Sequence, residues 1–178
     1  MLLKTHRPFA VAFTAATLMI VHDKIPCYTQ SQTMTDILQV GETLIASGIA
    51  SMLPDVDQIL PIPHRTITHT IWIPCIALFV AFKLFAMDVF IFPALLGAAL
   101  GYFSHLLGDA FSKAGIAWFW PLQGYHYYPG GAFVVKGPRG PFLPLYHSGD
   151  GMFKFMPLVW RIVAIFTVIV MSWRLFIR

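Results

Sequence analysis

The chain has 178 residues, of which 57% are hydrophobic and only 11% are charged. A soluble domain of average composition is about 25% charged, so this composition excludes an ordinary soluble enzyme and indicates a membrane protein. The net charge of +4 comes from basic residues that are scattered singly. Without a dense basic stripe we expect no binding of nucleic acid. The length suits one compact domain, and we treat residues 1–178 as a single membrane-embedded helical unit.

The amino terminus combines a basic start, MLLKTHRP, with an apolar run, FAVAFTAATLMIV. This combination is typical of a signal peptide. No small-residue cleavage site follows the apolar run, because Ile25 and Pro26 stand where such a site would be expected. We therefore expect this segment to be retained as a helix.

Hydropathy predicts five helical segments, at about 8–21, 36–53, 69–86, 88–109 and 157–178, and only some approach the roughly 20 apolar residues of a full membrane span. The first two are weak spans, the third and fourth form a tight hairpin, and the fifth is the clearest span. The long segment between the fourth and fifth is rich in Gly, Pro and aromatic residues. We expect it to lie at the membrane interface, with a short hairpin near 132–137.

Ionisable side chains stand at the ends of these segments. If successive segments cross or re-enter the membrane in alternation, the start of the first, the end of the second, the start of the third and the end of the fourth share one side. Side chains at those four ends can therefore meet in one site. They are His6, Asp55, Asp57, His64, His69, His105 and Asp109. Because two cysteines, Cys27 and Cys75, are too few for a cysteine zinc cluster, a metal here would be held by imidazole and carboxylate.

The fourth segment carries the clearest ligand spacing. His105 and Asp109 are four residues apart, so both lie on one helix face. Gly97 and Gly101 continue that face toward the other end of the helix. A G-x3-G pattern predicts a closely packed neighbouring helix just beneath the two ligands.

The other candidate ligands precede or follow helices. His64 is expected in a loop, and His69, five residues later, in the first helical turn, with either of the two threonines between them as N-cap. Asp55 and Asp57 are separated by one residue. In an extended segment both carboxylates would point the same way.

Each of these residues also has a purely structural interpretation. A single histidine in a membrane helix is more often a packing residue than a ligand. The clustering reverses this expectation, because ionisable groups in spans cost about 2.5–3.5 kcal/mol each, so their gathering at one interface indicates a functional site. His22, His126 and His147 lack partners at metal-ligand spacing and are interpreted as surface or loop residues. Glu42 is either a buried partner of a basic group or a residue on a water-facing surface.

Three motifs carry a family resemblance, and they span about residues 51–121. They are LPDVD, HRTITHT and GYFSHLLGDAFSKAGIAWFWP. In this order and spacing they resemble the YdjM-like family of membrane-bound, metal-dependent hydrolases of the bacterial inner membrane. That family is distantly similar to zinc-dependent phospholipase C and P1 nuclease. The resemblance implies an all-α, polytopic membrane protein, with about four to five membrane-embedded helices around a metal site in a phospholipase C/P1 nuclease-like helical core.

The resemblance also implies a ligand set. Position by position, the implied ligands are His6, Asp55, His69, His105 and Asp109, followed by His64 and Asp57. The sequence departs from the family pattern at Gln58, where the family usually has histidine, at Thr66, where it has glycine, and across Ser148–Phe153, where a glutamate is missing.

A set of imidazoles and carboxylates fits Zn²⁺, although Mn²⁺ or Fe would accept the same ligands, and we expect one to three ions. With an open coordination position, the metal would activate a water for attack on phosphorus or a carbonyl carbon. Asp55 or Asp57 is the candidate general base or bridging ligand, and Arg65 could pair with a phosphate oxygen. We therefore predict a hydrolase that cleaves a phosphoester of a phospholipid or another amphiphile.

Two other functions stay open at this stage. The metal could be structural, in a non-catalytic membrane protein whose weak first and second helices need such a bond. A small transporter with a relay of Glu42, Asp88 and His105 is a third hypothesis, which the lack of an inverted repeat disfavours. The distribution of basic residues predicts that the metal site faces the cytoplasm.

Overall fold

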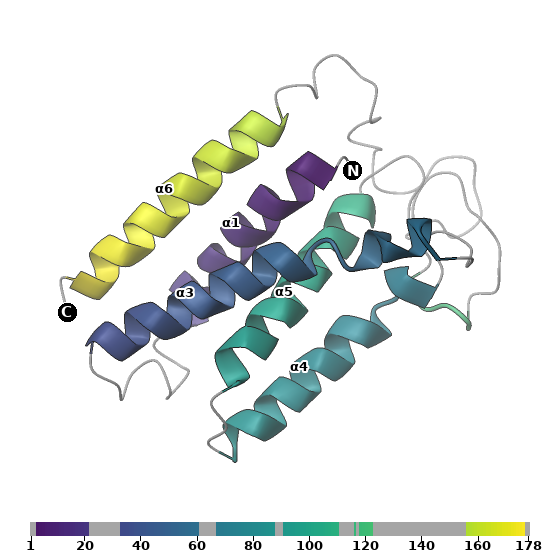
Figure 1. The fold of residues 1–178 in the computed structure, drawn as a ribbon, viewed down its shortest axis with the longest axis horizontal. Coiled ribbons are helices and arrows are strands. Elements are labelled where there is room, and N and C mark those ends of the chain that lie inside the picture. The colour runs from purple at the N-terminus through teal and green to yellow at the C-terminus, as the bar shows by residue number, and fades with distance from the viewer. Residues whose placement is uncertain are drawn as a thin grey trace.

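The computed structural model of the chain describes residues 3–21, 33–60, 67–87, 91–110, 116, 118–122 and 156–176. Its elements are, in chain order, α1 (Leu3–Val21), α3 (Thr33–Ala50), the short 3-10 helices η2 (Pro54–Gln58) and η3 (Ile67–His69), α4 (Trp72–Phe85), α5 (Phe92–Ala110) and α6 (Met156–Phe176). All regular structure in these residues is helical, which confirms the all-α prediction. The α-helices lie side by side, with α6 and α4 at opposite edges (Figure 1).

The helix positions agree with the prediction to within a few residues, except at the first helix. Hydropathy predicted a start at about residue 8, and proline favours the first turn of a helix, but α1 begins at Leu3 and contains Pro8. Contacts on both sides of the proline hold this extra turn: the ring of His6 stacks on that of His105, and Phe9 packs edge-on against Trp160 of α6. Tertiary packing thus overrides the local preference.

Helix α5 is the centre of the bundle. It packs against α1, α3 and α4, and most of its side chains are buried. One end of the bundle is apolar, with Leu18, Val40, Phe92 and Leu96 in a common cluster. The start of α1, the end of α3 with η2, the start of α4 with η3 and the end of α5 meet at the opposite end (Figure 1). The meeting of these four ends, which the sequence analysis expected, is therefore confirmed.

The two glycines of the G-x3-G pattern let α3 approach α5 to backbone contact. A Cβ atom placed on Gly97 would overlap the carbonyl of Thr43, and one placed on Gly101 would overlap the carbonyl of Ser47. Ser47 in turn bonds α1, through the Thr14 hydroxyl at 2.7 Å and the Ala10 carbonyl at 3.2 Å. The predicted close approach beneath the ligands is therefore confirmed. Through Ser47, it also joins α3 to both α5 and α1.

Replacing Gly101 by alanine is expected to lower the free energy of unfolding by about 3 kcal/mol, because neither backbone can move without separating α3 from α5. Thermal unfolding in detergent measures the change. Gly41→Ala in α3 is the matched control, since a Cβ there would meet nothing within 4 Å. That control should be neutral or slightly stabilising, because alanine favours a helix over glycine by about 1 kcal/mol. Equal effects of the two substitutions would contradict the close-packing account.

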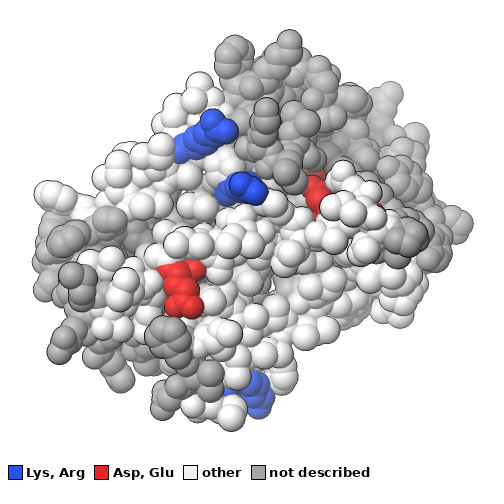
Figure 2. Space-filling model, viewed as in Figure 1, with Lys and Arg blue, Asp and Glu red and all other residues white. Residues whose placement is uncertain are grey.

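Many of the exposed side chains in the described part of the bundle are large and apolar. Among the described residues, one stretch, Ile37–Gln58, is long and apolar enough to cross a membrane, and shorter apolar helices run over His6–Val21, Trp72–Phe85 and Leu158–Val170. The sequence analysis had favoured the last helix as the clearest span and had ended the second near residue 53. The apolar stretch instead continues from α3 through η2. The face seen in Figure 2 carries few charged side chains.

Candidate metal centre

The turn between α3 and η2 aligns His105 with the other candidate ligands. Pro54 begins η2. The N–H groups of Met52 and Leu53 donate to carbonyls three residues earlier, but proline has no N–H and cannot make the next such bond, to Ser51. The carbonyl of Ser51, left outside that series of bonds, lies 2.7 Å from Nδ1 of His105. A carbonyl only accepts, so Nδ1 carries the hydrogen. In the neutral ring the lone pair is then on Nε2, which is buried and makes no hydrogen bond within the described part of the chain.

His69 is oriented in the same way by a carboxylate. Its Nδ1 lies 3.2 Å from Oδ2 of Asp57 and 3.0 Å from the hydroxyl of Thr68, which itself donates to Asp57 at 2.7 Å. These contacts fix the orientation of the ring, so that Nε2 of His69 faces Asp109. Burial lowers the pKa of His69 below its ordinary value of 6.5, although the nearby Asp109 opposes this shift. A lowered pKa favours the neutral imidazole, which is the form that binds a metal.

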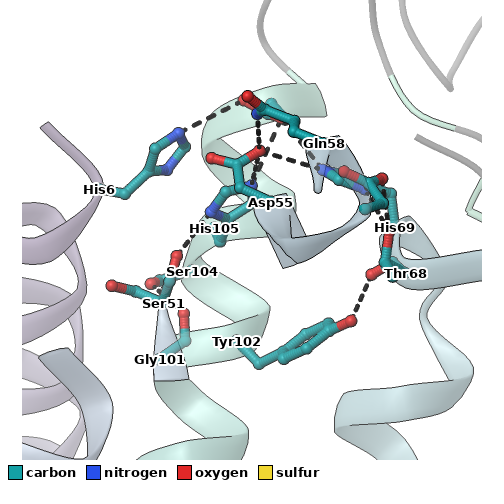
Figure 3. Close-up of polar contacts among 12 residues, drawn as sticks. His6, Ser51, Asp55, Gln58, Thr68, His69, Gly101, Tyr102, Ser104 and His105 are labelled. Atoms are coloured by element: carbon teal, nitrogen blue, oxygen red, sulfur yellow. Dashed lines mark hydrogen bonds and ion pairs between the residues drawn. The ribbon is translucent and has the colours of Figure 1, made fainter. Parts of the chain in front are cut away.

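Two carboxylates face these two Nε2 atoms. Oδ2 of Asp109 lies 3.5 Å from Nε2 of His69 and 3.5 Å from Nε2 of His105. Oδ1 of Asp55 lies 3.9 Å and 3.7 Å from the same two nitrogens. Figure 3 shows the side chains of Asp55, His69 and His105 pointing toward one another from η2, η3 and α5.

The spacing of these donor atoms fits a metal better than it fits hydrogen bonds. Distances of 3.5–3.9 Å exceed the roughly 2.7–3.2 Å of an N–H···O bond. Ligands about 2.1 Å from a tetrahedral ion would stand about 3.4 Å apart. The ligand atoms of Asp55, His69, His105 and Asp109 all lie within 4.8 Å of one another. These four residues could therefore hold a metal ion.

His6 joins the cluster from α1, although it is not one of those four. Its Nε2 lies 3.7 Å from Oδ1 of Asp109, and its ring stacks on His105 with centroids 3.8 Å apart. The side chain is buried. Asp109 thus lies between three imidazoles that come from α1, η3 and α5.

Four of the predicted ligands, Asp55, His69, His105 and Asp109, meet in a cluster that could hold a metal ion, and one predicted arrangement is wrong. Asp55 and Asp57 do not lie in an extended segment and do not point the same way. They belong to the 3-10 helix η2, whose tight turn places them on opposite nitrogens of His69. Asp57 therefore supports a ligand instead of sharing the donor set. His64 and Arg65 lie outside the described residues, as do Asp88, His22, His126, His147 and the segment 132–137.

The expected N-cap is also absent. Helix α4 begins at Trp72 after Ile71, which makes no side-chain cap bond. Thr68, one of the two threonines expected there, bonds Asp57 instead. His69 consequently lies in η3, before the helix, and not in its first turn.

Sequence reasoning missed the residues that support the ligands. The hydroxyl of Tyr102 donates to the carbonyl of Thr68, which ties η3 to α5 (Figure 3). Gln58 donates from Nε2 to Oδ1 of Asp55 at 3.0 Å. Tyr102 carried a usable signal, since it precedes His105 by three residues and so lies near the same helix face. The carbonyl of Ser51 carried none, because a backbone group has no sequence signature.

One of the comparisons with known proteins identifies a family. The family model for the YdjM inner membrane protein matches residues 1–177. The chain belongs to the YdjM inner membrane protein family. Neither the curated proteins nor the solved structures give a match. This member of the YdjM family is thus an inner membrane protein in which the matched region includes every residue of the candidate metal centre.

The supporting role of Asp57 predicts a measurable loss of affinity. Asp57→Asn keeps the four donors but removes the charge that holds the Nδ1 hydrogen of His69, so metal affinity should fall about 10- to 100-fold. Titration of the purified protein against a chromophoric chelator measures it. Thr68→Val, which removes only the hydroxyl bonded to Asp57, should cost less than Asp57→Asn. An unchanged affinity in Asp57→Asn would contradict the assignment.

Proposed function

We propose that this protein is a membrane-bound, metal-dependent hydrolase of phosphoesters, with Zn²⁺ held by Asp55, His69, His105 and Asp109. The observation that carries the proposal is the set of four donors within 4.8 Å, drawn from three separate elements. Structural zinc sites are more often closed by cysteine, whereas sites of histidine and carboxylate are common in hydrolytic enzymes. When bound, such an ion lowers the pKa of a water ligand and supplies a nucleophile at neutral pH.

Asp55 is the group that we assign to accepting the proton. Its side chain is 11% exposed, whereas those of Asp57 and Asp109 are 0% and 1% exposed. A substrate or solvent molecule can thus reach Asp55 and not the other two carboxylates. The amide of Gln58 holds Oδ1 of Asp55 toward the cluster. The second oxygen of the carboxylate is then available as a base.

Support for an anionic phosphoester comes from the surroundings of the site. Arg7 follows His6 in α1, and its guanidinium is exposed beside Met52 at the end of α3. Guanidinium groups bind phosphate oxygens well, and we keep Arg65 as a second candidate for this role. The apolar outer faces of α3, α4 and α6 support a polytopic arrangement in the inner membrane, which makes a phospholipid or another amphiphilic phosphoester the substrate class. The positive-inside rule supports a cytoplasmic metal site.

The first experiment measures metal and activity in the same preparation. Detergent-purified protein is stripped with chelator, reloaded with Zn²⁺ or Mn²⁺, and assayed by elemental mass spectrometry and by release of the alcohol from a chromogenic phosphodiester. The proposal predicts bound metal, at about one ion or more for each chain, and activity that disappears and returns with it. Bound metal without hydrolysis of any phosphoester tested would contradict the enzymatic assignment.

A structural metal is the second candidate function, and one observation favours it. His69, His105 and Asp109 are almost completely buried and join η3 to α5, so an ion there would also fasten separate segments. In that case chelation should lower the unfolding temperature greatly, and no exchangeable water should be detected on the bound ion. For an enzyme with an open coordination position, a water on the ion should exchange and be displaced by phosphate.

A further inference from the structure

The metal end of the bundle carries an unusual surface. Among its residues 51–60, 67–72, 116 and 118–122, the only exposed polar side chain is Gln58, and the start of α1 adds the exposed Arg7. The exposed large apolar side chains beside the ligands form what we call the apolar collar. They are Ile59, Leu60, Ile67, Trp72, Phe119 and Leu122. Ile59 and Leu122 are 85% and 80% exposed, so they pack little against the described residues.

The residues of the apolar collar belong to, or lie next to, the elements that carry the candidate ligands. Ile59 follows η2, which carries Asp55, and Ile67 begins η3, which ends at His69. The segment that carries Phe119 is bonded to the start of α4: the Trp118 carbonyl accepts from the N–H of Ile71 at 2.9 Å, and that of Trp120 accepts from the indole of Trp72 at 3.1 Å. The ring of Phe119 packs edge-on against that of Trp72. In Figure 2 acidic atoms near the η2 end lie beside uncharged side chains, with a basic side chain close by on the same face.

An end of the bundle that faced water would carry many charged side chains. Contiguous exposed apolar surface is instead a marker of a binding or membrane surface. The length of α4 indicates how deep the collar lies in the membrane. Its 14 residues span about 21 Å at 1.5 Å per residue, and the hydrocarbon core is about 30 Å thick. Lys83 lies in the last turn of α4 and is exposed, so it marks the interface at the opposite end.

The remaining thickness, about 9 Å, extends past Trp72 and therefore over η3 and the collar. The apolar stretch of α3 agrees with this depth, because it runs through η2 to Gln58 and includes Asp55. Tryptophan at the collar is also typical of a membrane interface. Both helices thus place the donor atoms at the level where acyl chains meet lipid headgroups.

We infer that the apolar collar is inserted among the acyl chains of the leaflet, so that a membrane lipid reaches the metal centre sideways from the bilayer. Asp55, the most exposed of the four donors, is then the group that a headgroup phosphoester meets first. The contact between collar and lipid stands independently of catalysis. The assignment of that lipid as the substrate rests on the proposed hydrolase function.

The test places single fluorophores on the collar. In a Cys27→Ser, Cys75→Ser background, Ile59→Cys and Leu122→Cys are labelled with an environment-sensitive dye and reconstituted in phosphatidylcholine nanodiscs. Phe79→Cys, on the exposed face of α4, serves as the lipid-facing reference. We expect doxyl-labelled lipids to quench the collar dyes at least twofold, as they quench the reference, and aqueous iodide to quench them little.

Quenching of the collar dyes by iodide and not by doxyl lipid would overturn the inference, because the collar would then face water. Protection from both quenchers would also overturn it, because a second copy of the chain or another protein segment would then cover the collar.

A second measurement separates lateral access from the proposed activity. Ile59→Asn combined with Leu122→Asn should lower the ratio of bilayer-lipid hydrolysis to soluble-phosphodiester hydrolysis at least tenfold. If the protein hydrolyses neither substrate, the proposed function fails while the quenching result still decides the position of the collar. A ratio that does not change would show that lipids do not enter across the collar.

Discussion

Replacing Asp109 by asparagine is expected to abolish metal binding at micromolar metal, with a loss of affinity of about 100-fold or more. Asp109 faces three imidazoles: Oδ2 lies 3.5 Å from Nε2 of both His69 and His105, and Oδ1 lies 3.7 Å from Nε2 of His6. The substitution keeps the volume of the side chain but removes its charge. Loss of a group that only supports a ligand costs about 10- to 100-fold, and loss of a central anionic ligand should exceed that.

Competition with a chromophoric chelator measures the affinity, and elemental mass spectrometry measures the metal that remains after purification. Glu42→Gln is the control, because it neutralises a carboxylate on α3 that is outside the four-residue donor set. His105→Gln is a second variant that separates metal loss from misfolding, since it removes an imidazole while Asp109 stays. Size-exclusion profiles and helical circular dichroism identify any variant that does not fold. Retention of metal by Asp109→Asn at the affinity of the control would contradict the proposed centre.

The general outline of the fold was predictable from sequence for simple reasons. Apolar segments of helical length separated by breaks define the helices, and alternation alone brings the ends carrying His6, Asp55, His69 and Asp109 together. The G-x3-G pattern correctly located the contact of α5 with a neighbour. It could not identify α3 as that neighbour, because any helix without bulky side chains at the contact could have fitted. The length of α1 depended on contacts with α5 and α6, which lie far away in the sequence.

The site was predictable as a set of residues but not as a geometry. Spacing placed His105 and Asp109 on one helix face, and this holds in the structure. The roles of Asp55 and Asp57 depended on whether their segment was extended or helical, and two acidic residues one apart fit either conformation. Pro54 was the informative residue, because a proline that follows a helix often starts a new turn. The orienting carbonyl of Ser51 appears only once α3 and α5 are packed.

The exchange of Asp55 for asparagine should separate chemistry from metal binding. Asparagine keeps an oxygen that can face the ion, and Gln58 can still bond that oxygen. An amide oxygen does not accept a proton at neutral pH, so a variant lacking the base should turn over about 10²- to 10⁴-fold more slowly. Metal content should fall far less than in Asp109→Asn. Rates are measured on a soluble phosphodiester at saturating Zn²⁺, together with the metal content of the same sample.

Asp57→Asn is the control for this test, because its activity should respond to added metal in the opposite way. Its carboxylate is fully buried against His69 and Thr68 and cannot reach a substrate, so excess metal should restore most of its activity. Asp55→Asn should stay slow however much metal is added. If excess metal rescues both variants equally, Asp55 is only a ligand and the proton acceptor must be sought elsewhere. If neither is rescued, the two carboxylates share one role, which the opposite placement of their oxygens around His69 argues against.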